Sequence, residues 1–182
     1  MRVLVAGVGN IFLGDDGFGS EVVRALQREQ LPEGVQLVDY GIRGVHLAYD
    51  LLEPWEALVL IDALPPSGKP GAVEVYELEA ETGDGTISSG TISSGTVSSS
   101  AVESGTASLD AHSLDPNSVF ASLRALGGTP PRTFVVGAHV ESVEEGIGLT
   151  PVVQDAVTGA ASVVLGLVGS MAADAATADQ GA

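Results

Sequence analysis

The start of the chain decides the fold: the apolar run V-L-V-A (residues 3–6) leads into G-V-G-N-I-F-L-G-D-D-G-F-G (residues 7–19). A short apolar run that ends in a glycine-rich turn is typical of a buried strand followed by a tight loop. Glycine allows such a loop to bend sharply or to approach a ligand closely. The adjacent acids Asp15 and Asp16 would stand beyond the carboxyl end of this strand, where open α/β sheets bind their ligands.

The rest of the chain alternates between strand-like and helix-like segments. Strands are expected at residues 3–6, 35–38, 58–61, 72–78 and 133–136, and helices at 17–30, at 45–52, from 115 onward and from 150 onward. The continuous apolar run at 58–61 is typical of a central parallel strand, and the alternating run at 72–78 of an edge strand. This order predicts an α/β fold, a three-layer αβα sandwich around a mostly parallel, twisted sheet of about five strands.

One low-complexity segment does not fit this alternation. Residues 82–108 are rich in serine, threonine and glycine with a period near five, as in T-I-S-S-G at 86–90 and again at 91–95. Such residues bury too little apolar surface to offset the entropy lost on ordering. We therefore expect a single domain over residues 1–170, a mobile insertion at 82–108 and a flexible tail at 171–182.

Composition limits the classes of function. The 182 residues carry a net charge of −17 and no cysteine, which excludes disulfides, thiolate metal sites and a cysteine nucleophile. The negative charge disfavours nucleic acid and anionic membranes as partners, and it favours a cationic peptide or a metal. No uninterrupted apolar run reaches the roughly 20 residues of a membrane span, and the first residues lack a signal-peptide pattern. A cytoplasmic monomer is the resulting expectation.

The glycine-rich loop has two competing functional interpretations, a nucleotide cradle and an acidic site. G-x-G follows a strand and Asp39 ends the next one, as the dinucleotide fingerprint requires. However, Phe12 occupies the position of the third glycine, and Asp15 and Asp16 add negative charge where a pyrophosphate needs donors. These charges favour a metal or acid–base site, although Asp16 could also serve only as a cap of the following helix.

Three residues on separate loops form a candidate metal site. Asp16 follows the first strand, Asp62 follows the third, and His112 precedes the helix expected from residue 115. Two carboxylates and an imidazole suit Ni²⁺ or Zn²⁺. Each residue also has a structural interpretation, as a helix cap, a strand-end turn residue and a solvated loop histidine. The alternative histidine is His139, which follows the last strand.

The motif G-x-G-N-x-x-x-x-D-D-G-x-G at residues 7–19, with Asp39 and the later I-D-A at 61–63, resembles the hydrogenase maturation proteases. These are nickel-dependent endopeptidases that process the C-terminus of [NiFe]-hydrogenase large subunits. The resemblance covers residues 1–80 and 110–168. It departs from the family after Asp39, where Tyr40 intervenes before Gly41.

The resemblance implies the three-layer α/β fold and an endopeptidase that recognises nickel in the large-subunit precursor and removes its C-terminal peptide. The implied metal ligands are Asp16, Asp62 and His112, with the nickel supplied by the precursor and with Zn²⁺ or Cd²⁺ able to occupy the same site. For catalysis we expect an aspartic-type mechanism, with Asp16 as general base and Asp39 beside it. Direct polarisation of the scissile carbonyl by the metal stays open. Two alternative functions also stay open, a nucleotide-binding, Rossmann-like module and a non-enzymatic metal-binding protein.

Overall fold

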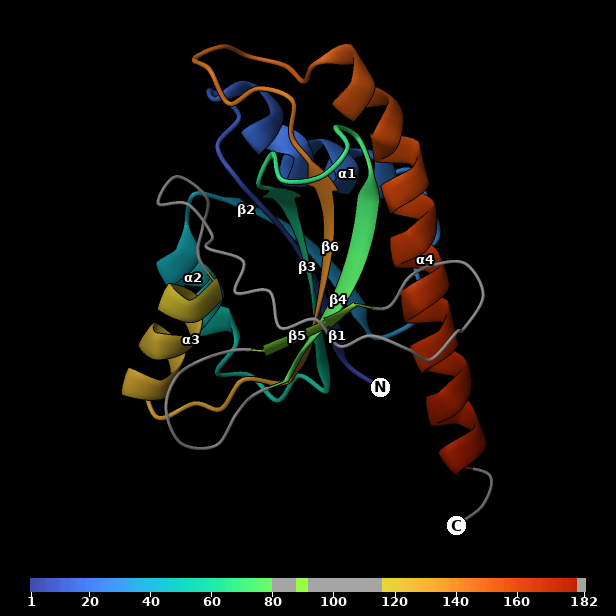
Figure 1. Ribbon diagram of the computed structural model, residues 1–182. Helices are drawn as coiled ribbons and strands as arrows, with labels where there is room; N and C mark the ends of the chain where they lie inside the picture. The colour runs from blue at the N-terminus through green and yellow to red at the C-terminus, as the bar shows by residue number, and fades with distance from the viewer. Residues whose placement is uncertain (80–87, 92–115, 180–182) are drawn as a thin grey trace.

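The computed structural model describes residues 1–79, 88–91 and 116–179, and a β-sheet runs through its centre (Figure 1). The strands are β1 (Val3–Val8), β2 (Val35–Gly41), β3 (Ala57–Leu64), β4 (Val73–Glu79), β5 (Ser88–Thr91) and β6 (Arg132–His139). The helices are the 3₁₀-helix η1 (Gly14–Gly17) and the α-helices α1 (Phe18–Leu26), α2 (Gly44–Asp50), α3 (Pro116–Ala125) and α4 (Pro151–Asp179).

The described strands form one sheet in the order β2-β1-β3-β6-β4-β5. The first four are parallel to one another, whereas β4 runs antiparallel to both β6 and β5. Because parallel strands end at the same edge of a sheet, the loops that follow β1, β2, β3 and β6 gather at one place. This carboxyl edge lies at the top of Figure 1.

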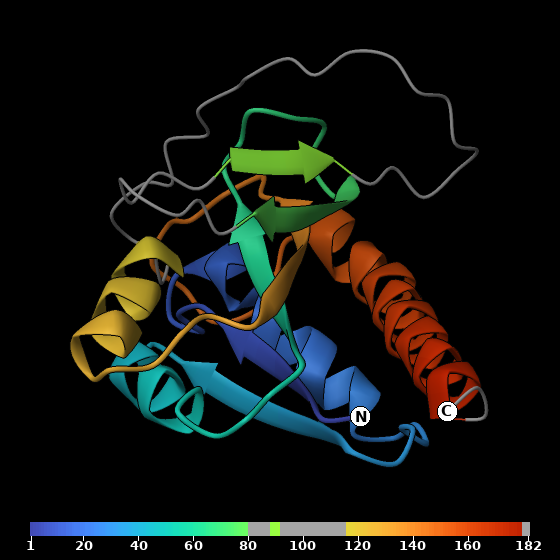
Figure 2. The ribbon, with the colours of Figure 1, turned by 90° about the horizontal axis from the view of Figure 1, so that it is seen from below.

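Helices cover both faces of the sheet. Helices α1 and α4 lie on one face, and α2 and α3 lie on the other (Figures 1 and 2). Each face has its own hydrophobic core, one beneath α1 and α4 and one beneath α2 and α3. The three-layer α/β fold with a mostly parallel sheet is therefore confirmed, with β5 as a sixth strand.

Strand β3 contributes to both cores, and all of its residues are buried. Val59 and Ile61 pack beneath α1 and α4, whereas Leu58 and Leu60 pack beneath α2 and α3. A strand buried on both faces explains the continuous apolar run in the sequence. Because side chains alternate along a strand, Asp62 continues the row of Leu58 and Leu60 on the α2–α3 face.

Several boundaries differ from those expected. Helix α1 ends at Leu26 instead of residue 30. Helix α4 continues to Asp179, so most of residues 171–182 are helical instead of an unstructured tail; their many alanines favour a helix. Strand β4 is not an edge strand, because β5, formed within the 82–108 segment, pairs beside it. The rest of that segment and His112 lie outside the described residues.

Helix α4 is the longest described element. Judged by length and composition alone, Pro151–Thr177 is apolar enough to cross a membrane, with a mean hydropathy of 1.8 in its most apolar window. The test averages over interrupting polar residues, so it does not contradict the expectation that no uninterrupted apolar run is long enough to span a membrane. The core helix of a soluble protein passes the same test, and the buried residues of α4, such as Val153, Val164 and Val168, pack in the core beneath α1 and α4.

Candidate active site

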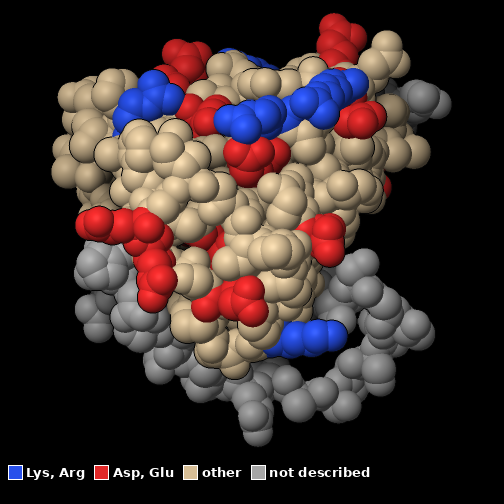
Figure 3. All heavy atoms as spheres, turned by 90° about the horizontal axis from the view of Figure 1, so that it is seen from above, with Lys and Arg blue, Asp and Glu red and all other residues tan. Residues whose placement is uncertain are grey.

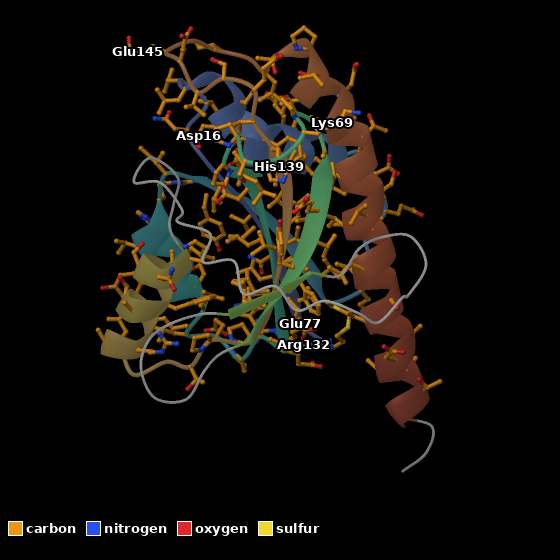
Figure 4. All side chains as sticks on the ribbon, viewed as in Figure 1. Asp16, Lys69, Glu77, Arg132, His139 and Glu145 are labelled. Atoms are coloured by element: carbon orange, nitrogen blue, oxygen red, sulfur yellow. The ribbon has the colours of Figure 1, made fainter. Side chains whose placement is uncertain are left out.

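Two buried carboxylates lie at the carboxyl edge of the sheet. Asp16 belongs to η1, which follows β1, and Asp62 lies near the end of β3. Each is only 3% exposed. Figure 4 shows Asp16 beside the upper ends of the strands. Their charges interact electrostatically, so the structure brings together two of the three residues that the sequence assigned to the metal.

The loop after β1 holds Asp16 by folding back over it. The backbone N–H of Asn10 donates a hydrogen bond to Asp16 Oδ2 at 2.7 Å. Gly9 has a φ of 124°, and a Cβ there would lie 1.9 Å from the backbone oxygen of Asp16. Only glycine fits this position, because a side chain would meet both a strained backbone and a direct clash. The first G-x-G of the motif thus sets the position of the acid.

Asp62 is held in its neutral form in the free protein. Burial raises the pKa of its carboxyl from 3.8 to about 8, the hydrogen bond from the Ala63 N–H opposes this shift, and the negative charge of Asp16 adds to it. The Ala63 N–H lies 2.8 Å from Asp62 Oδ1. A buried carboxylate of this kind becomes ionised readily only when a cation approaches it. This site is therefore chemically suited to receive a metal ion.

Asp15 does not join this pair. Its fully buried carboxylate faces the loop between β6 and α4, where it accepts hydrogen bonds from the backbone N–H groups of Glu141, Ser142 and Thr150 at 2.6–3.0 Å. The Thr150 hydroxyl donates a further one at 3.0 Å. Asp15 therefore joins the β1 and β6 loops.

Replacing Asp15 with alanine is expected to destabilise the protein strongly. Four donors lose their acceptor, and each buried group left unpaired costs about 1–3 kcal/mol. For a chain of this size we expect the melting temperature to fall by roughly 10 °C. Asp155→Ala, at an exposed position on α4, is the control. Equal melting temperatures of the two variants would contradict the bracing role of Asp15.

Asp39 is an exposed residue near the carboxyl end of β2. Its Oδ1 accepts hydrogen bonds from the Ser20 hydroxyl at 2.9 Å and from the Gly41 N–H at 3.0 Å. Asp39 therefore links β2 to α1. A catalytic role for Asp39 stays a prediction.

His139 has partners other than the two acids. Its Nδ1 lies 2.7 Å from the carbonyl oxygen of Pro65, and its Nε2 lies 3.2 Å from Glu74 Oε1. A Cβ at Gly68 would meet the imidazole ring at 2.4 Å, so the β3–β4 loop covers it closely. Within the described ranges, no three His, Asp or Glu side chains form a group able to hold a metal. His139 therefore does not complete the site, and the assignment to His112 stays a prediction.

Comparison with known proteins identifies relatives of one kind. The family model described as hydrogenase maturation protease matches residues 86–167. The hydrogenase 2 maturation protease of Escherichia coli is 30% identical over 156 residues, which are 85% of this chain and 82% of that protein. A putative hydrogenase maturation protease of Methanocaldococcus jannaschii is 33% identical over 78 residues, so the match spans 42% of this chain and about half of that relative.

Solved structures agree with these relatives. The hydrogenase maturating endopeptidase HybD of E. coli has a TM-score of 0.70 and 28% identity, and the match covers 94% of each chain. A hydrogenase 2 maturation peptidase from a Thaumarchaeota archaeon has a TM-score of 0.62 and 26% identity, over 93% of this chain and 99% of that one. Together with the alignment over most of the E. coli protease, this likeness shows that the chain belongs to the hydrogenase maturation protease family.

Proposed function

We propose that this protein is an endopeptidase that recognises nickel in the precursor of a [NiFe]-hydrogenase large subunit and cleaves off its C-terminal peptide. The observation that carries the proposal is the pair Asp16 and Asp62, two buried carboxylates at the carboxyl edge of a sheet in a maturation protease fold. Burial raises the pKa of the Asp62 carboxyl to about 8, so a cation bound there would favour its ionised form. Nickel brought by the substrate would be such a cation.

The nickel ligands in this proposal are Asp16, Asp62 and His112, with the metal arriving as part of the substrate. Carboxylate and imidazole donors suit nickel, and zinc or cadmium would accept the same set. Asp62 lies on the face that α3 covers, and α3 begins at Pro116, only a few residues after His112. That short connection supports the choice of His112 as the third donor.

The chemistry we propose is water attack on the scissile peptide bond. Asp16, which the Asn10 N–H orients, accepts the proton of the attacking water as general base. It then passes this proton to the leaving amine as the C–N bond breaks, which releases the two peptide products and restores the carboxylate. Nickel bound at the site would supply Lewis acidity toward the scissile carbonyl. Asp62 must lose its proton when it binds the metal, so binding is expected to release a proton. Asp39, at the rim of the site, would contribute negative charge near Asp16.

A cleavage assay with two forms of one precursor tests the proposal. We expect the protein to shorten the nickel-loaded large-subunit precursor and to leave the nickel-free precursor intact, as followed by intact-protein mass spectrometry. Binding of nickel without any cleavage would instead indicate a metal-binding protein that is not an enzyme. Tight binding of NAD(H) in a parallel titration would favour the nucleotide-binding alternative, which Phe12 and the acidic pair oppose.

A further inference from the structure

Large apolar side chains are exposed on the loops around the candidate active site. Ile147 is 80% exposed, Ile42 71% and Phe12 60%. Three more exposed residues lie on the same loops or directly after them. We call the whole set the apolar rim: Ile11, Phe12, Ile42, Val45, Val143 and Ile147. Apolar side chains exposed singly need no explanation, but a contiguous set typically marks a surface that binds another molecule.

Backbone contacts join the loops of the apolar rim into one surface. Gly146, next to Ile147, donates its N–H to the carbonyl of Phe12 at 2.9 Å and accepts a hydrogen bond from the Gly14 N–H at 3.0 Å. On the other side, the Gly9 N–H donates to the carbonyl of Gly41 at 3.1 Å, next to Ile42. The three loops therefore lie side by side around η1, which carries Asp16.

The part of the apolar rim after β6 is held in place in the free protein. Asp15 accepts hydrogen bonds from both ends of this loop, at Glu141 and at Thr150. A loop braced in this way loses little conformational entropy on binding, which favours affinity. Val143 and Ile147 are therefore exposed on a preorganised loop. They do not belong to either hydrophobic core, so their exposure is available for binding a partner.

The same loop carries a definite charge. Residues 141–150 contain Glu141, Glu144 and Glu145 and no basic residue. Figure 4 shows Glu145 projecting from the loop above the sheet, and Figure 3 shows both acidic and basic side chains around a largely uncharged middle of this face. Arg43 stands between Ile42 and Val45 on the other side, so the acidic side of the apolar rim is the loop after β6. That side fits an apolar segment with basic residues beside it.

We propose that the apolar rim docks the large-subunit precursor, through an apolar segment of the precursor flanked by basic residues. This inference rests on the proposed function and adds the surface that selects the substrate protein. The loops of the rim lie around η1, which carries Asp16, so a segment bound there lies next to the candidate active site. Docking contributes binding energy without touching the reacting atoms, and it therefore acts on KM and not on kcat.

Binding of the nickel-free precursor, which is not cleaved, tests the docking surface directly. The double variant Phe12→Ser/Ile147→Ser is expected to bind the precursor about 10-fold more weakly or worse, because exposed apolar anchors dominate such interfaces. The matched control Leu52→Ser/Leu126→Ser changes exposed apolar residues just after the C-terminal ends of α2 and α3, toward the opposite edge of the sheet from the rim, and should bind as the parent does. Glu144→Gln/Glu145→Gln should slow association and weaken its salt dependence.

The outcomes separate the docking surface from the proposed activity. Weaker binding by the rim variant, with a raised KM and an unchanged kcat toward the nickel-loaded precursor, supports the docking surface. Binding equal to that of the control, or no binding of the precursor by the unmodified protein, overturns it. Cleavage of the nickel-loaded precursor by the unmodified protein is scored independently, so the proposed function can stand when the docking surface fails.

Discussion

Replacing Asp62 with asparagine is expected to abolish cleavage of the nickel-loaded precursor and, at the same time, to make the protein more stable at neutral pH. The amide keeps the shape of the carboxyl and can still accept the hydrogen bond from Ala63, but it cannot supply the negative charge that a nickel ligand needs. The loss of activity should exceed the roughly 10- to 100-fold cost of removing a group that only supports a metal ligand.

The gain in stability follows from the sign of the pKa shift at Asp62. Its pKa is about 8 in the folded protein and 3.8 for the unperturbed carboxyl. Below about pH 4 both states hold the proton, and the neutral carboxyl is tolerated in the fold. Between about pH 4 and 8 the unfolded state releases its proton first, so the stability of the unmodified protein falls as the pH rises, by up to about 1.4 kcal/mol per pH unit.

The asparagine variant lacks this titration. The difference in melting temperature between Asp62→Asn and the unmodified protein should therefore be small at pH 4 and should grow steadily to pH 8. Asp155→Asn, at an exposed position on α4, controls for loss of a negative charge and should show no such growth. Normal cleavage by Asp62→Asn, or a stability difference independent of pH, would contradict the role assigned to this carboxyl.

The pairing of Asp16 with Asp62 could be predicted because the sequence places both at the carboxyl ends of parallel strands, and such strands end at one edge. The structure differs only in that Asp62 still belongs to β3. The choice between Asp15 and Asp16 could not be predicted in the same way. The two residues are adjacent in a 3₁₀-helix, where neighbouring side chains point about 120° apart, so one faces the site and the other faces away. The partners of Asp15 lie 126 to 135 positions later in the chain, so no local sequence pattern predicts these contacts.

The role of His139 could not be predicted from the sequence either. The sequence places it after a strand, where it is a reasonable alternative ligand. The pairing of β6 with β3 sets His139 opposite Leu64 and so beside the carbonyl of Pro65. The pairing of β6 with β4 brings Glu74 to the same ring. The length of α4 also escaped prediction, because an alanine-rich continuation with few packing contacts resembles a disordered end in composition alone.

The glycines of the first motif allow close packing of the backbone, and a single substitution can test this role. Gly19 lies in the first turn of α1, and a Cβ there would lie 2.2 Å from the carbonyl oxygen of Val8 and 2.4 Å from that of Ile61. Both oxygens belong to central strands, so neither can move aside. Helix α1 can therefore lie against β1 and β3 only because residue 19 has no side chain.

Gly19→Ala is accordingly expected to lower the free energy of unfolding by more than about 4 kcal/mol, a large part of the stability of an ordinary domain. Urea unfolding measures this as a fall in the midpoint concentration. The matched control is Gly159→Ala, on α4, where an added Cβ meets nothing within 4 Å and should stabilise the helix by up to about 1 kcal/mol. Asp16 lies just before α1. A Gly19→Ala protein that stays folded by shifting this helix should therefore also lose cleavage activity toward the precursor. A Gly19→Ala protein as stable and as active as Gly159→Ala would show that close contact of α1 with the sheet does not position the site.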